Sequence, residues 1–66
     1  MKSAKEMFED LGFEQVFHTT CIEYYNKEKD RSVWFFQDTE IIEIMFDIDM
    51  RTLQAINQQI NELGWK

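Results

Sequence analysis

The sequence predicts an α+β domain: a four-stranded antiparallel β-meander flanked in sequence by an N-terminal and a C-terminal helix, in the order α-β-β-β-β-α. Apolar residues recur at helical spacing within 4–11 and again within 49–63, and four short segments rich in β-branched and aromatic residues lie between them. Two helices with one apolar stripe each can cover one face of a sheet, so we expect both to pack on the same side. Residues 1–66 are too few for a second domain.

The first helix is marked at both ends. Ser3 and Glu6 stand three residues apart, as in a capping box, in which each side chain bonds the other residue's backbone amide. Gly12 can take the left-handed conformation that ends a helix, which would bring Phe13 back onto Phe8. The apolar stripe between these signals consists of Ala4, Met7, Phe8 and Leu11.

Two strands are predicted next, at Glu14–Thr19 and Cys21–Asn26, because both segments are rich in β-branched and aromatic residues. A tight connection near Thr19 would join them into a hairpin. The run from Asn26 to Arg31 alternates in charge and is typical of a solvated loop. The last two strands, Ser32–Gln37 and Ile41–Phe46, are separated by a polar turn of four residues, Gln37-Asp38-Thr39-Glu40.

The C-terminal helix is predicted over Asp49–Leu63. Asp49 suits the N-cap because its carboxylate can accept a hydrogen bond from a free amide of the first turn. Gly64 and Trp65 repeat the stop signal of the first helix. The expected apolar stripe is Met50, Leu53, Ile56, Ile60 and Leu63, and the expected polar face is Arg51, Gln54, Gln58 and Asn61.

More apolar strand residues are present than the helices can cover. Successive strand residues point to opposite faces, so we assign one set to the core: Ile22, Tyr24, Val33, Phe35, Ile42, Ile44 and Phe46. The other face keeps Tyr25, Trp34, Phe36, Ile41 and Met45. Exposed apolar patches commonly mark interaction sites, which predicts a partner or dimer interface here. The alternatives are a different register, or a sheet that curls and buries both faces.

Composition limits the remaining function classes. One cysteine excludes an intrachain disulfide, and one histidine with it excludes the usual structural zinc sites. A chain this short has a small core, so self-association as a homodimer is expected to supply further burial. The net charge of −6 opposes binding to a nucleic-acid backbone and is compatible with a basic protein surface. Solubility alone also explains the charge.

No catalytic, metal or cofactor site is expected. His18 and Cys21 could form a nucleophile pair, but no glycine-rich turn is present to build an oxyanion hole. Four acidic residues near the last strand and helix are interpreted as a solvated rim: Glu40, Glu43, Asp47 and Asp49. Both glycines serve as helix stops, so no phosphate-binding loop remains. We therefore expect a protein that is not an enzyme.

The N-terminal residues are mixed in character rather than an apolar run, and no segment approaches the roughly 20 apolar residues of a membrane span. With its free cysteine, the chain is therefore expected to reside in the cytoplasm, without membrane contact.

The motif pattern as a whole resembles small uncharacterised proteins encoded by phages and prophages of Gram-positive bacteria. The segments that carry the resemblance are Ala4–Phe8, Leu11–Glu14, Ile22–Tyr25, Val33–Phe36, Leu53–Ile56 and Glu62–Trp65. These are helix stops and stripe positions, so they speak for a fold and assign no catalytic residue. The resemblance implies a bacterial host cytoplasm and an accessory role.

The expected function is therefore a non-enzymatic, acidic accessory protein that binds a host or phage protein, with inhibition of a host antiviral defence as one form. Two alternatives stay open. One is a protein that sequesters a small ligand or nucleotide at a subunit interface lined by Tyr25, Trp34 and Arg31. The other is a nucleic-acid mimic that blocks a basic groove with its acidic side chains.

Overall fold

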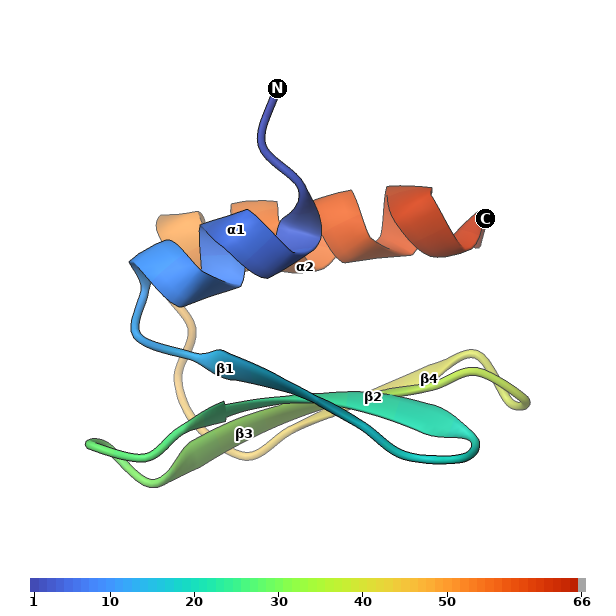
Figure 1. The fold of residues 1–66 in the computed structure, drawn as a ribbon, viewed down its shortest axis with the longest axis horizontal. Helices are drawn as coiled ribbons and strands as arrows, with labels where there is room; N and C mark the ends of the chain where they lie inside the picture. Colours follow the sequence, from blue (N-terminus) through green and yellow to red (C-terminus); the bar gives the residue numbers. More distant parts are fainter. Residues whose placement is uncertain (66) are drawn as a thin grey trace.

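The structure, a computed structural model, describes residues 1–65 and confirms the predicted α+β fold. Both helices lie on one side of a single four-stranded sheet, and no helix or strand of residues 1–65 covers the other side (Figure 1). The elements are α1 (Ala4–Asp10), β1 (Glu14–Phe17), β2 (Cys21–Asn26), β3 (Arg31–Phe36), β4 (Ile41–Ile44) and α2 (Met50–Leu63). Three of the four strands differ in their bounds from the prediction: β1 and β4 each end two residues earlier, and β3 begins and ends one residue earlier.

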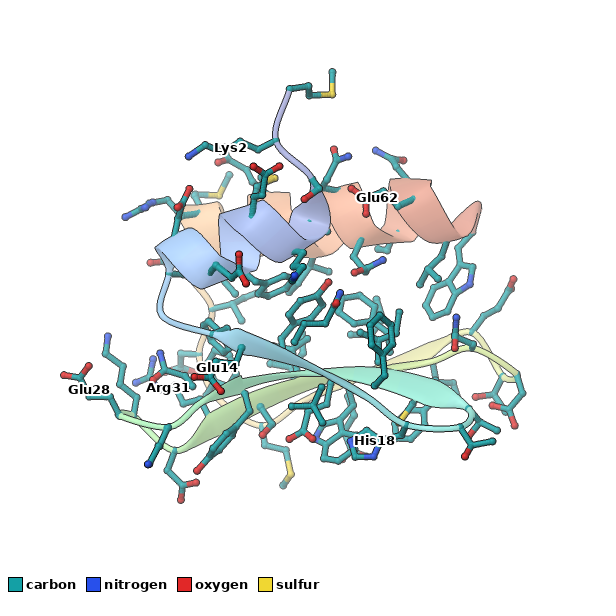
Figure 2. All side chains as sticks on the ribbon, in the orientation of Figure 1. Lys2, Glu14, His18, Glu28, Arg31 and Glu62 are labelled. Atoms are coloured by element: carbon teal, nitrogen blue, oxygen red, sulfur yellow. The ribbon has the colours of Figure 1, made fainter. Side chains whose placement is uncertain are left out.

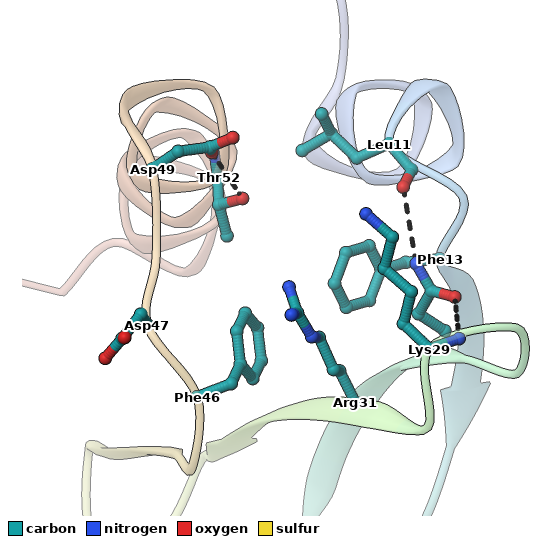
Figure 3. A pocket seen from close by; sticks show the side chains of 9 residues that line it. Leu11, Phe13, Lys29, Arg31, Phe46, Asp47, Asp49 and Thr52 are labelled. Atoms are coloured by element: carbon teal, nitrogen blue, oxygen red, sulfur yellow. Dashed lines mark hydrogen bonds between the residues drawn. The ribbon is translucent and has the colours of Figure 1, made fainter.

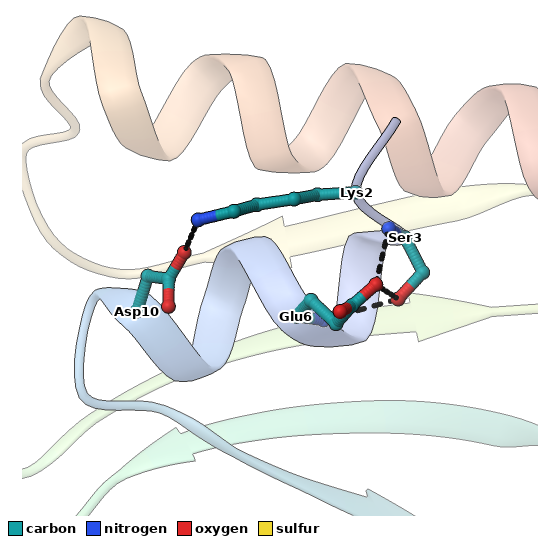
Figure 4. A network of polar contacts seen from close by, with 4 residues as sticks. All are labelled: Lys2, Ser3, Glu6 and Asp10. Carbon is teal, nitrogen blue, oxygen red and sulfur yellow. Dashed lines mark hydrogen bonds and ion pairs between the residues drawn. The ribbon is translucent and has the colours of Figure 1, made fainter.

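Helix α1 begins with the predicted capping box. The Ser3 side chain accepts from the Glu6 amide, and the Glu6 carboxylate accepts from the Ser3 amide at 3.0 Å (Figure 4). The bond from the Ser3 amide, together with a second bond from the Ser3 hydroxyl to the same carboxylate, lowers the pKa of Glu6. Lys2 forms an ion pair with Asp10 across the same helix. With only seven residues, α1 is too short to persist without such caps and without tertiary packing.

The sheet is a meander in the order β1-β2-β3-β4, antiparallel throughout. The pairs Asn26↔Arg31 and Phe36↔Ile41 close two four-residue turns, at residues 27–30 and 37–40. The last residue of each turn, Asp30 and Glu40, has a positive φ of 51° and 56°. The turn at 37–40 was predicted from its polar residues, although neither turn contains the glycine that usually takes this conformation.

The core lies between the helices and the sheet and is largely aromatic. Phe8 of α1 stacks on Tyr24 of β2 with ring centroids 3.9 Å apart, and edge contacts join Phe8 to Phe13 and to Phe35. Each of these four rings is at most 5% exposed. Such pairs add about 0.5–1.5 kcal/mol each beyond the area that they bury. They account for how a seven-residue helix is held in place.

A buried polar network runs through this core. The Tyr24 hydroxyl accepts from Gln15 Nε2 at 2.9 Å and donates to Gln59 Oε1 of α2. Burial raises the pKa of Tyr24, so its hydroxyl remains a proton donor at neutral pH. The network ties β1, β2 and α2 together at one point.

Helix α2 starts and stops as predicted, but its buried face is rotated. Asp49 caps the N-terminus, and Gly64 at φ 74° ends the helix, with the Trp65 amide donating to the Ile60 carbonyl at 3.1 Å. The prediction that Met50 belongs to the buried stripe is wrong, since it is 66% exposed. Because α2 packs against α1 as well as the sheet, its buried residues cover a wider arc than one stripe. They are Thr52, Ala55, Ile56 and Gln59.

Candidate functional site

We call the sheet surface turned away from the helices the open face. The strand pairing fixes its members, because directly paired residues share a face and alternate residues change face. Following these pairs from β1 to β4 gives the residues of this face, which include those predicted from the sequence. The open face consists of Glu14, Val16, Cys21, Glu23, Tyr25, Ser32, Trp34, Phe36, Ile41 and Glu43, with Met45 directly after β4.

The structure places all five predicted interface residues on or beside this face. Ile41 and Met45 are 55% and 87% exposed. Trp34 and Phe36 stack with ring centroids 6.1 Å apart and are half-buried, as is Tyr25. The sheet does not curl far enough to bury them, so the alternative of a sheet closed on both faces does not apply.

A polar cluster surrounds Trp34. The ring of His18 stacks on Trp34 at 5.2 Å, and its Nε2 lies 3.0 Å from Oε1 of Glu23. The second oxygen of Glu23 accepts from the Ser32 hydroxyl at 3.0 Å. Figure 2 shows His18 on the side of the sheet away from the helices. Both oxygens of the central carboxylate therefore have hydrogen-bond partners.

The order of this cluster does not match that of a hydrolase. In nucleophilic catalysis the base lies between the nucleophile and the acid, whereas here Glu23 lies between Ser32 and His18. Among the described residues, the side chains of His18 and Cys21 are also not hydrogen-bonded to each other, since the two residues are linked only through the backbone, where the His18 amide donates to the Cys21 carbonyl at 2.9 Å. Cys21 is buried at 6% exposed. What the cluster does is fix the orientation of Trp34 on the open face.

Sequence reasoning missed the cluster because it depends on register. His18 and Ser32 are 14 positions apart, and only the pairings Glu23↔Trp34 and Tyr25↔Ser32 bring them to one place. The outward-facing Glu23 in a strand without another charged residue was the one available signal, because a half-buried carboxylate needs partners.

Arg31 lies on the other side of the sheet from Tyr25 and Trp34. It is the first residue of β3, where it pairs with Asn26, and it shares the helix-facing side with Val33 and Phe35. One chain therefore does not bring Arg31 together with Tyr25 and Trp34, as the nucleotide-site alternative assumed. Arg31 instead lines a cavity of about 260 Å³ at one end of the helix–sheet interface (Figure 3).

The four acidic residues of the predicted rim are all exposed. Asp49 has the predicted capping role, since its Oδ1 accepts from the amide and the hydroxyl of Thr52 at 2.9 and 2.8 Å. The hydrogen bond from the Thr52 amide, above all, lowers the pKa of Asp49. Glu43 stands at the edge of the open face, next to Trp34 in the strand register.

Within residues 1–65, no group of three or more His, Cys, Asp or Glu side chains is arranged to hold a metal ion. None of the described helices combines the length and the apolar character needed to cross a bilayer. Comparisons with protein-family models, with curated proteins and with solved structures gave no match.

Proposed function

We propose that this chain is a non-enzymatic binding protein that acts through its open face, and that the first occupant of this face is a second copy of the chain. The observation that carries the proposal is the combination of apolar side chains and satisfied polar groups on one uncovered surface. Trp34 and Phe36 form its middle, and Ile41 and Met45 are its most accessible apolar members. Exposed apolar patches of this kind are typical of protein interfaces.

The charges on the open face suit an interface. Protein interfaces have a core depleted of charge and a polar rim. Here the free carboxylates Glu14 and Glu43 are on the two edge strands, β1 and β4, while the central Glu23 is bonded to His18 and Ser32. Two open faces packed against each other would form a β-sandwich with the helices outside, an arrangement in which sheets stack about 10 Å apart.

The size of the face indicates the class of interface that it can form. The molecule measures 29 × 25 × 19 Å, and the sheet extends along the longest and shortest of these axes (Figure 1). This corresponds to on the order of 500 Å² per copy, below the roughly 800 Å² that each partner contributes to a standard interface. We therefore expect a reversible dimer rather than an obligate one.

Sedimentation equilibrium over a wide concentration range tests the proposal, with a matched pair of variants. Met45→Asp puts a charge on the open face and is expected to yield a monomer. Met50→Asp makes the same change at an exposed methionine in the first turn of α2, where an acidic residue is tolerated, and is expected to leave the dimer intact. A wild type that stays monomeric at high concentration contradicts the proposal, as does equal behaviour of the two variants.

Salt distinguishes the second copy from a basic partner. Each copy carries a net charge of −6, so added salt should screen the repulsion and strengthen self-association. Binding to a basic host or phage protein, the context implied by the resemblance, should weaken under the same conditions. Inhibition of a host antiviral defence would be a specific form of binding to a basic partner. Its test requires a purified host protein that binds the wild type but not Met45→Asp.

A further inference from the structure

The cavity that contains Arg31 is formed where three segments meet: the end of α1, the turn between β2 and β3, and the start of α2. Its volume is about 260 Å³. Figure 3 shows the Arg31 side chain rising between the rings of Phe46 and Phe13, with Lys29 beside it. The lining residues are Leu11, Phe13, Asn26, Lys29, Arg31, Phe46, Asp47, Asp49 and Thr52.

Two cations face this cavity without a carboxylate partner. Among residues 1–65, no carboxylate oxygen lies within 4.0 Å of the Arg31 guanidinium or the Lys29 ammonium, although the chain has 13 acidic residues. The guanidinium is 5.2 Å from the centroid of Phe46, which holds it by a cation–π contact. Its planar edge therefore remains available for a bidentate anion.

The turn that carries Lys29 is fixed by a buried side chain. Asn26, 4% exposed, accepts from the Lys29 amide at 3.0 Å through Oδ1 and donates to the Leu11 carbonyl at 3.4 Å through Nδ2. One asparagine thus links the end of α1 to the β2–β3 turn. The cavity wall is consequently held from two sides, and binding does not require this turn to become ordered.

The two carboxylates at the cavity do not neutralise the cations. Asp49 is oriented by its bonds to Thr52 as the cap of α2, and the Asp47 carboxylate turns away from Arg31 (Figure 3). Both still add negative potential nearby, which disfavours a ligand of high negative charge. A single negative charge fits this balance best.

The remaining wall is apolar, and the cavity is small. Phe13 is buried at 5% exposed, and Leu11 and Phe46 are partly buried around it. A volume of about 260 Å³ is below the roughly 300–1,000 Å³ of pockets for drug-sized ligands. This favours a compact ligand over a nucleotide.

We propose that this cavity binds a small organic monoanion: a carboxylate group held by Arg31 and Lys29, with a flat apolar body lying against Phe13 and Leu11. The site lies on the opposite side of the sheet from the open face. It therefore stands independently of the proposed dimer.

Titration of the isotope-labelled protein with benzoate, followed by amide chemical shifts, tests this site. Benzoate is expected to shift the amides of Lys29 and Thr52 in a saturable way, while the neutral isostere benzamide is not. Arg31→Gln should weaken benzoate binding at least about tenfold, the effect of losing one charge-assisted contact. Arg51→Gln, at the other arginine of the chain and outside this cavity, is the matched control and should bind like the wild type.

Arg31→Lys keeps the charge and should retain part of the affinity, which separates charge recognition from a loss of folding. The proposal is overturned if the wild type does not respond to benzoate, if benzamide binds equally well, or if Arg31→Gln and Arg51→Gln behave alike. Tighter binding of adenosine monophosphate than of benzoate would overturn the size argument.

Discussion

The hydrogen bond between Tyr24 and Gln59 offers the sharpest test of the packing. Tyr24 is 0% exposed and Gln59 4%, and the tyrosine hydroxyl is the donor to the Gln59 carbonyl oxygen. Tyr24→Phe removes the hydroxyl and leaves two polar groups of the network, Gln59 Oε1 and Gln15 Nε2, without their partner. An unsatisfied buried group costs about 1–3 kcal/mol.

A loss of about 2 kcal/mol corresponds to a fall in Tm of roughly 8–16 °C for a domain of this size. Gln59→Leu removes the acceptor and should cost a similar free energy of unfolding. The double variant replaces the donor and the acceptor of the Tyr24–Gln59 bond by apolar groups, which can be nearly neutral for that pair, and leaves only Gln15 Nε2 without its partner. It should therefore be more stable than the sum of the single changes predicts, with a coupling energy of about 0.5–3 kcal/mol.

Urea denaturation of the four proteins, with unchanged m-values, measures this coupling. Tyr25→Phe is the control, because it makes the same chemical change at a half-buried open-face tyrosine whose hydroxyl bonds exposed Asp30 at 3.2 Å. Little change is expected there. Additive single effects, or an equal loss of stability in Tyr25→Phe, would show that the Tyr24 network does not have the role assigned to it.

Three further predictions concern single positions. Gly64→Ala should cost about 1–2 kcal/mol of stability because of its left-handed backbone. Gly12→Ala should cost more, because the added Cβ would lie 3.2 Å from Asn26 Nδ2, whereas at Gly64 no described atom beyond the chain neighbours lies within 4 Å; thermal denaturation of both variants checks the order. Because folding lowers the pKa of Asp49, its carboxylate stabilises the folded state at every pH above 3.8, the ordinary pKa of the group. This stabilisation is lost as the pH falls through the lowered pKa of the folded state. Asp49→Asn keeps a side-chain acceptor for the helix cap but cannot be protonated in this range, so the variant should lose less stability on acidification. Urea denaturation midpoints measured across this pH range check the difference. Cys21, at 6% exposed, should react with a thiol reagent only as fast as the protein opens, and reaction at the rate of a free thiol would contradict its burial.

The fold was predictable because its signals are local. The capping box at Ser3, the glycine stops and the turn at residues 37–40 each lie within a few positions of one another. Alternation along β3 likewise separated Trp34 and Phe36 from the core residues. Such patterns need no knowledge of which segments meet in space.

The features that sequence reasoning missed depend on long-range contacts. Gln59 was not assigned to the core because its burial requires Tyr24 from another element. The orientation of Arg31 was missed because β3 begins one residue earlier than predicted, which gives Arg31 the same side as Val33. The sequence predicts Arg31 as part of the preceding loop, where alternation along the strand assigns no face.

The position of α2 in the chain has a consequence for biosynthesis. The sheet is synthesised before Ala55, Ile56 and Gln59, the residues with which α2 covers it. Until they leave the ribosome, the nascent meander exposes aromatic side chains on both surfaces, a state prone to aggregation. We therefore expect the growing polypeptide to be a chaperone client until α2 has emerged and packed on the sheet.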